Sequence, residues 1–132
     1  MHKFQTRVYY QDTDASGIVY HSNYLKFAER ARTEWLLEKG LPNTVLQEKK
    51  IGFVIRRANI DYLKPACYED LITIETQISA IHASYMEVEH TFYRENVKLA
   101  RITLTVVFID LTSFKPMRLP EEIKELFMKG EN

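Results

Sequence analysis

A single long amphipathic helix is the feature that most restricts the fold of this chain. Between about residues 21 and 39, apolar residues recur every three or four positions and charged residues lie between them. The residues that share the apolar face are Tyr24, Phe27, Ala28, Ala31 and Trp35, with Leu25 and Leu36 widening it. Most of the remaining chain alternates apolar and polar residues, as half-buried strands do. One apolar helix face must therefore cover one apolar sheet face, which predicts an α+β domain.

Five segments are predicted as strands from this alternation. Their apolar sides are Phe4, Thr6, Val8 and Tyr10 in the first; Val54, Ala58, Ile60 and Tyr62 in the second, interrupted by Arg56; Ile72, Ile74, Thr76, Ile78 and Ala80 in the third; Met86, Val88 and Phe92 in the fourth; and Ala100, Ile102, Leu104, Val106 and Phe108 in the fifth. The fifth segment is apolar on both faces near Val107, so we expect it to lie inside the sheet. Shorter helices are expected at residues 43–49 and 121–129. We expect residues 1–132 to form one domain, an antiparallel sheet curled around the long helix.

Composition excludes several classes of function. The 132 residues carry 18 basic and 18 acidic side chains, and this balance argues against a nucleic-acid partner. No apolar run approaches the ~20 residues that span a bilayer, so no membrane insertion is expected. The single cysteine, Cys67, is compatible with a reducing compartment, and the first residues lack the apolar core of a secretory leader. A cytoplasmic location is therefore expected.

The stretch from Tyr9 to Glu34 concentrates the chemistry. Its sequence, YYQDTDASGIVYHSNYLKFAERARTE, places two carboxylates and His21 just before the expected start of the long helix. A helix N-terminus offers unpaired N–H groups and the positive end of a dipole, both of which favour developing negative charge. A carboxylate beside such an end is a candidate base or nucleophile with an oxyanion site.

The composition of this loop also matches a plain turn and the start of a calcium loop. In isolation, Asp12 and Asp14 are typical turn residues, because aspartate accepts hydrogen bonds from nearby backbone N–H groups. Asp12, Asp14, Ser16 and Gly17 also match the first positions of a calcium loop, but Asn23 stands where the bidentate glutamate should be. We keep the turn interpretation for Asp12 and predict no metal site.

The whole chain resembles a known family. The run YYQDTDASGIVYHSNYLKFAERARTEWL, the segment FVIRRANIDYLKPACYEDLITIETQI and the stretch after KPMRLP are similar to hot-dog-fold acyl-CoA thioesterases of the 4-hydroxybenzoyl-CoA type. Within that family, the sequence looks most similar to the YbgC branch, the thioesterases associated with the Tol–Pal system. The resemblance implies a long helix wrapped by a five-stranded antiparallel sheet, assembled into a homodimer or homotetramer.

The resemblance also implies roles for particular residues. Asp14 matches the catalytic carboxylate, Tyr10 the tyrosine four residues before it and His21 the histidine seven residues after it. It further implies that a backbone N–H near the helix start polarises the thioester carbonyl, and that no metal or cofactor takes part. Because Tyr10 alternates onto the same face as Val8, its simplest role is packing in the core. We therefore expect Tyr10 to position the catalytic residues without contacting the substrate.

Substrate binding is assigned to residues of the same loop and to basic residues further on. The candidates are Gly17, Val19, Tyr20, Arg56 and Arg57. Arginine pairs well with phosphate, which coenzyme A carries. Arg56 and Arg57 are expected on opposite faces of a strand, so at most one faces a given ligand. Lys64 is a third basic candidate. For each of these three residues, a solvent-exposed charge with no ligand is as good an interpretation as phosphate binding.

The predicted function is hydrolysis of acyl-CoA to free acid and CoA, within lipid metabolism. The alternative is a non-catalytic scaffold that binds an acyl group or acyl carrier protein, for which Asp14 would be dispensable. A hot-dog dehydratase is a further alternative, against which the D-x-D loop argues. The sequence leaves open the acyl chain length, the choice between CoA and acyl carrier protein, and whether Asp14 acts as base or nucleophile.

Overall fold

The fold is a five-stranded antiparallel sheet laid over one long helix. The computed structural model describes residues 1–129. The strands are β1 (His2–Arg7), β2 (Ile51–Tyr62), β3 (Leu71–Ile81), β4 (Tyr85–Arg94) and β5 (Val97–Asp110). Their order in the sheet is β1-β3-β4-β5-β2, and each neighbouring pair is antiparallel. The α+β architecture predicted from periodicity is therefore confirmed.

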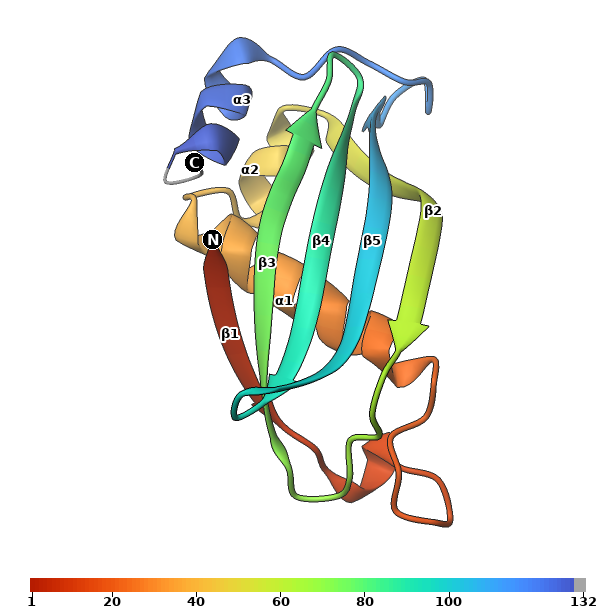
Figure 1. The fold of residues 1–132 in the computed structure, drawn as a ribbon. Coiled ribbons are helices and arrows are strands. Elements are labelled where there is room, and N and C mark those ends of the chain that lie inside the picture. The colour runs from red at the N-terminus through yellow and green to blue at the C-terminus, as the bar shows by residue number, and fades with distance from the viewer. Residues whose placement is uncertain (130–132) are drawn as a thin grey trace.

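Helix α1 (Asn23–Glu38) crosses one face of the sheet (Figure 1). Its buried side chains are Asn23, Tyr24, Phe27, Ala28, Ala31 and Trp35, which include the five residues predicted to share the apolar face. Of the two residues predicted to widen that face, Leu36 is partly buried against the core and Leu25 is exposed. They pack against inward-facing residues of the strands, and together these form one hydrophobic core. Two shorter helices, α2 (Asn43–Glu48) and α3 (Glu121–Met128), confirm the other helical predictions to within one residue.

The first strand is shorter than its alternation predicted. β1 ends at Arg7, and residues Tyr10–Asp12 form a 3₁₀ turn, η1. Val8 is still buried, but Tyr10 is 74% exposed, so its predicted place in the core is wrong. The physical reason is Asp12, which accepts a hydrogen bond from the N–H of Tyr9 and turns the chain away from the sheet.

The second strand contains a β-bulge that the alternation did not predict. Ile55 pairs with Val106 and Arg57 pairs with Thr105, which leaves Arg56 as the extra residue. Such an insertion reverses which residues face the core. Phe53 therefore faces inward before the bulge, whereas Ala58, Ile60 and Tyr62 pair with inward-facing residues of β5 after it. Val54, predicted on the apolar side, is 45% exposed.

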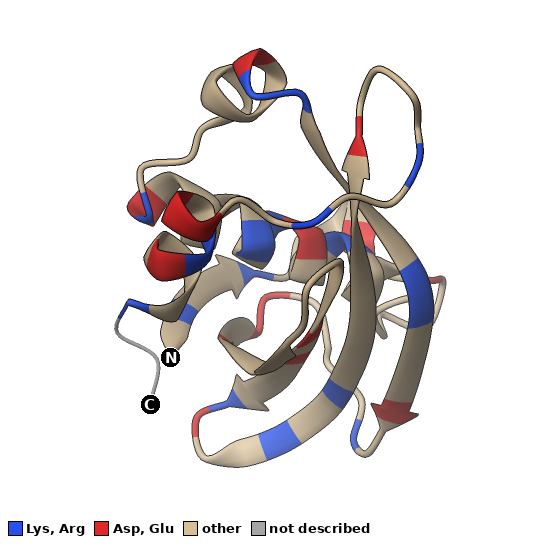
Figure 2. Cartoon of the chain, turned by 90° about the horizontal axis from the view of Figure 1, so that it is seen from above, with Lys and Arg blue, Asp and Glu red and all other residues tan. Residues whose placement is uncertain are grey.

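The two edges of the sheet are β1 and β2, and β5 lies between β4 and β2 as an interior strand, as predicted. β4 is the central strand. Acidic and basic residues are interspersed over α1 and the strands (Figure 2), in keeping with the zero net charge. None of the helices in residues 1–129 is long and apolar enough to cross a bilayer.

Candidate active site

Asp14 begins a tight turn that fixes its own carboxylate. The N–H of Gly17 donates to the carbonyl of Asp14 at 3.0 Å, and Gly17 has a φ of +81°, a conformation that glycine adopts without strain. The Oδ1 atom of Asp14 accepts from the N–H of Ser16 at 2.8 Å, from the Ser16 hydroxyl, and more weakly from the N–H of Ile18 at 3.4 Å. No hydrogen bond from residues 1–129 reaches Oδ2, so this oxygen is available to a ligand.

These hydrogen bonds keep Asp14 ionised. The hydroxyl of Ser16 is the largest cause that lowers the pKa of the Asp14 carboxyl below its ordinary value of 3.8, followed by the Ser16 N–H. His21 adds a smaller electrostatic contribution in the same direction. Donors aimed at a carboxylate favour its charged form. Asp14 is therefore an anion at neutral pH, as either predicted catalytic role requires.

Asp12 has a structural position, in agreement with its interpretation as a turn residue. It is 3% exposed, and both of its oxygens are engaged: Oδ2 accepts from the N–H of Tyr9 at 2.8 Å, and Oδ1 accepts from Nδ2 of Asn23 at 3.0 Å. Because Asn23 is the first residue of α1, Asp12 ties the loop to the start of the helix.

The start of α1 lies beside this loop and carries an available N–H group. Within the first turn, the N–H of Asn23 donates to the carbonyl of Tyr20 and the N–H of Leu25 to that of Ser22. No hydrogen bond among residues 1–129 uses the N–H of Tyr24, and Ser22 supplies no side-chain cap. An unpaired N–H at the positive end of a helix is a suitable donor to a developing oxyanion.

A cavity of about 200 Å³ lies at this helix start. It is lined by Ile18, Val19, His21, Tyr24, Tyr62, Leu63, Lys64 and Pro65. Asp14 itself is not a lining residue, and its loop borders the cavity through Ile18. The N–H of Asp14 donates to the carbonyl of Ile18 at 2.9 Å, and the N–H of Ile18 donates weakly to Oδ1 of Asp14. The cavity thus brings together the loop, His21 and the helix N-terminus, three features that the sequence placed in one stretch.

Tyr62 closes the cavity from the end of β2. Its ring lies 4.8 Å from the ring of His21, centroid to centroid, and its hydroxyl donates to the His21 carbonyl at 3.0 Å. It also packs edge-on against Tyr24. The sequence pattern predicts no role for Tyr62 and Tyr24 in the site, because their contact depends on β2 ending beside the start of α1.

Four of the other residues predicted for the site, Tyr10, Tyr20, Arg56 and Arg57, do not line this cavity. Tyr10 packs edge-on against Tyr68 and does not line the cavity, and Tyr20 is half exposed. Arg56 and Arg57 are exposed at the bulge of β2, six and five residues before Tyr62, which is roughly 20 and 16 Å along a strand. Within one chain, the basic residue at the cavity is Lys64.

The loop of residues 63–70 holds the Asp14 loop in place. The N–H of Val19 donates to the carbonyl of Ala66 at 2.9 Å, and the N–H of Tyr68 donates to the carbonyl of Gly17 at 3.0 Å. These bonds anchor both ends of the Gly17–Val19 segment, so the position of the Asp14 turn depends on a loop about 50 residues away in sequence.

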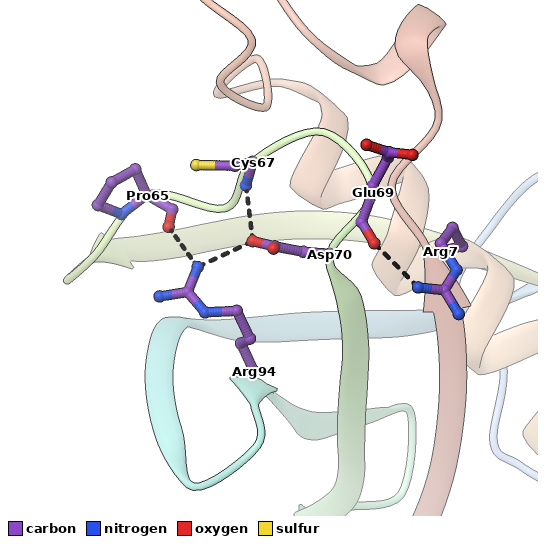
Figure 3. A network of polar contacts seen from close by, with 6 residues as sticks. All are labelled: Arg7, Pro65, Cys67, Glu69, Asp70 and Arg94. Atoms are coloured by element: carbon purple, nitrogen blue, oxygen red, sulfur yellow. Dashed lines mark hydrogen bonds and ion pairs between the residues drawn. The ribbon is translucent and has the colours of Figure 1, made fainter.

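A charged network in turn fixes the 63–70 loop (Figure 3). The guanidinium of Arg94 donates to Oδ2 of Asp70 at 2.8 Å and to the carbonyl of Pro65 at 3.2 Å. The same Asp70 oxygen accepts from the N–H of Cys67, and Arg7 donates to the carbonyl of Glu69. Arg94 on β4 and Arg7 on β1 thus connect the sheet to the loops that surround Asp14.

A model of the thioesterase-like superfamily matches residues 8–127, which span nearly the whole chain. The chain belongs to the thioesterase-like superfamily. The match includes the Asp14 turn, the start of α1 and all strands except β1.

Individual members of the superfamily are similar over most of their length. The acyl-CoA thioesterase YbgC of Haemophilus influenzae is 40% identical over 94% of this chain and 92% of its own. The acyl-CoA thioester hydrolase YbgC of Escherichia coli is 36% identical over 92% of this chain and 91% of its own. The resemblance to the YbgC branch is therefore confirmed.

A solved thioesterase-like structure gives the same result for the fold. A probable thioesterase from Bartonella henselae superimposes with a TM-score of 0.85 at 38% identity, covering 90% of this chain and 98% of that one. The predicted hot-dog fold is confirmed.

Proposed function

We propose that this chain is an acyl-CoA thioester hydrolase in which Asp14 is the catalytic carboxylate. The observation that carries the proposal is one cavity that is lined by Tyr24, whose N–H at the start of α1 is unused, and by Ile18 of the loop that presents Asp14, an ionised carboxylate with one free oxygen. The YbgC relatives are named acyl-CoA thioesterase and acyl-CoA thioester hydrolase, which supports an acyl-CoA as the substrate of this chain.

The proposed chemistry begins with polarisation of the thioester. The carbonyl oxygen accepts a hydrogen bond from the Tyr24 N–H, and the dipole of α1 stabilises the negative charge that builds up on this oxygen. In a nucleophilic route, Oδ2 of Asp14 attacks the carbonyl carbon, the C–S bond breaks, and the CoA thiolate leaves and takes a proton from water. Water then hydrolyses the acyl–aspartyl anhydride, which releases the acid and restores Asp14.

In the alternative route, Asp14 acts on water. The carboxylate accepts a proton from a water molecule as that water attacks the carbonyl, and the proton then passes to the departing thiolate. The lowered pKa of Asp14 makes it a weaker base but leaves it fully ionised. Both routes consume one water and produce one acid and one thiol.

His21 and Lys64 are proposed to bind substrate from the rim of the cavity. The ring of His21 is held against Tyr62, so it is a fixed wall beside the helix start. Lys64 also lines the cavity, and its cation is suited to a phosphate of CoA. Within one chain, Lys64 thus lies closer to the cavity than Arg56 and Arg57, whose role in CoA binding stays a prediction.

We also propose that the chain forms a homodimer or larger homo-oligomer. β2 is a twelve-residue edge strand, and an open edge of this length invites pairing with another strand. Val54 and Ile55 on it are 45% and 43% exposed. Pairing of two β2 edges would extend the sheet and bring a second chain's residues toward the bulge.

The experiment that tests the function is a hydrolysis assay over acyl-CoA substrates of increasing chain length. Free thiol is measured with a chromogenic disulfide, and the proposal expects turnover on at least one of them. Complete inactivity on aliphatic and aromatic acyl-CoA, together with measurable binding, would instead favour the predicted acyl-binding scaffold. A parallel series with acyl carrier protein thioesters tests that carrier. A cytoplasmic location and a place in lipid metabolism stay predictions.

A further inference from the structure

A second cavity of the described chain is separate from the Asp14 site. It has a volume of about 360 Å³ and lies between the C-terminal half of α1 and the sheet. Eight of its lining residues are apolar: Trp35, Leu36, Phe53, Ile55, Ile78, Met86, Val88 and Val106. It shares no lining residue with the cavity at His21. Along α1, its residue Arg32 lies nine residues from the helix start, or ~14 Å at the usual helical rise.

Arg32 is the unusual member of this lining. Its Nη1 lies 3.1 Å from Nε2 of His90, and Nδ1 of His90 lies 2.8 Å from the hydroxyl of Thr76. Arginine can only donate, so Nε2 accepts and the proton of the neutral ring sits on Nδ1, from which it is donated to Thr76. His90 is fully buried, and burial followed by the charge of Arg32 lowers its pKa to about 3. His90 therefore orients the guanidinium but contributes no negative charge.

The charge of Arg32 has no counter-ion in direct contact. Among residues 1–129, no carboxylate forms an ion pair with it, although Glu29, one turn earlier on α1, also lines the cavity and acts on it through space. A partly buried guanidinium with unused donors in an apolar cavity matches a ligand that is mostly apolar and ends in an anionic oxygen pair.

We propose that this cavity binds an apolar monocarboxylate, a free fatty acid of medium chain length, with its carboxylate at Arg32 and its chain against the apolar lining. The site would hold the same class of compound that thioester hydrolysis releases, at a place apart from Asp14. The inference goes beyond the proposed catalytic function and does not depend on Asp14, because no residue of the Asp14 loop takes part.

The test is calorimetric titration of the full chain with octanoate, with octan-1-ol as the uncharged probe of equal length. Replacing Arg32 by Gln keeps a donor for His90 and removes the charge, so the octanoate Kd should rise at least about tenfold, the usual size of a lost charge-assisted hydrogen bond. The octanol Kd should stay the same. Replacing Arg32 by Lys should retain part of the affinity.

Two further variants sharpen the result. Arg30→Gln removes the same charge from an exposed arginine of α1 that lies over the Phe27 ring and outside the cavity, so octanoate binding should not change. Glu29→Gln removes the negative charge that opposes a carboxylate, so the octanoate Kd should fall roughly two- to fivefold. This variant leaves the buried Arg32–His90–Thr76 cluster intact. If Arg32→Gln does not fold, the octanoate Kd of Glu29→Gln therefore tests whether the cavity binds a carboxylate.

Several outcomes overturn the proposal. They are no binding of octanoate to the wild type, equal losses in Arg32→Gln and Arg30→Gln, an octanol affinity that falls as far as that of octanoate, or a weaker octanoate affinity in Glu29→Gln. Asp14→Asn should bind octanoate as the wild type does. Hydrolytic activity and octanoate binding can therefore fail independently.

Discussion

The N–H of Ser16 donates to Oδ1 of Asp14 at 2.8 Å, and the hydroxyl of Ser16 donates to the same oxygen. The donors lie only two positions after the acceptor in sequence, so the turn that presents Asp14 also sets its charge state. Oδ2 is left for the substrate, and this division between the two oxygens is the basis of the proposed chemistry.

Replacing Ser16 by Ala should move the acidic limb of the pH–rate profile to higher pH. The Ser16 hydroxyl is the main cause of the lowered Asp14 pKa, and it stabilises the charged form. Without it, the pKa rises toward its ordinary value and protonation begins to inactivate the enzyme at a higher pH. The measurement is kcat/KM between pH 3 and 7. Ser79→Ala, on β3, is the control and should keep the wild-type profile.

Replacing Asp12 by Asn should cost stability rather than activity. Asn presents one acceptor where Asp12 has two, so either the N–H of Tyr9 or the amide of Asn23 loses its partner. A buried donor left unsatisfied costs about 1–3 kcal/mol in the free energy of unfolding. Urea denaturation measures this loss. A variant with wild-type stability and strongly reduced kcat would instead move Asp12 into the catalytic machinery.

His90 should make the chain less stable as the pH falls below neutral. The folded-state pKa of His90 is about 3, against an ordinary value of 6.5. Above pH 6.5, both folded and unfolded chains carry a neutral ring and this residue adds no slope. Between 6.5 and 3, only the unfolded chain binds the proton, so the free energy of unfolding falls with falling pH by at most about 1.4 kcal/mol per unit.

The comparison that isolates this effect uses His90→Gln. Its free energy of unfolding, followed by denaturation from pH 7 to 4, should fall less steeply than that of the wild type, even if it is lower throughout. His82→Gln, an exposed histidine stacked on Tyr85, should leave the slope unchanged. Parallel curves for wild type and His90→Gln would show that His90 titrates normally in the folded chain.

Light scattering after gel filtration should give at least twice the chain mass of 15.6 kDa. The open β2 edge and the exposed Val54 and Ile55 are the reason. A stable monomer with full activity would remove the proposed role of a second chain near Arg56 and Arg57.

Periodicity was sufficient for most of the fold. The apolar face of α1 follows from the spacing of Tyr24 to Trp35, and most of each strand follows from simple alternation. In β3 the alternation breaks at a bulge between Ile78 and Ala80, after which Ile81 packs on the core in place of the predicted Ala80. The prediction for the first half of β2 was wrong because one inserted residue, Arg56, reverses the alternation. Phe53 and Ile55 are both apolar and alternate with Val54, and this pattern could have indicated which side faces the core before the bulge. β1 was extended too far because alternation continues through Tyr10 after the pairing has ended.

The candidate site was predictable only where it is local. Asp14 and His21 lie seven residues apart and the sequence places them together. Tyr62 and Lys64 reach the same cavity through the tertiary fold, which the sequence order does not reveal. His90 occupies an inward position between Val88 and Phe92, so its burial was readable from the alternation. Its contact with Arg32 was not, because it depends on how α1 crosses the sheet.

The most direct measurement is the turnover of Asp14→Asn on the best acyl-CoA substrate. This substitution keeps the size of the side chain and removes the anion that attacks the carbonyl or activates water. Loss of a general base or nucleophile should lower kcat by ~100-fold or more with little change in KM. His21→Ala should be intermediate, because the backbone N–H makes the proposed contact to the oxyanion. A folded Asp14→Asn variant, verified by circular dichroism and melting temperature, with near-wild-type kcat would contradict the assignment of Asp14 as the catalytic carboxylate.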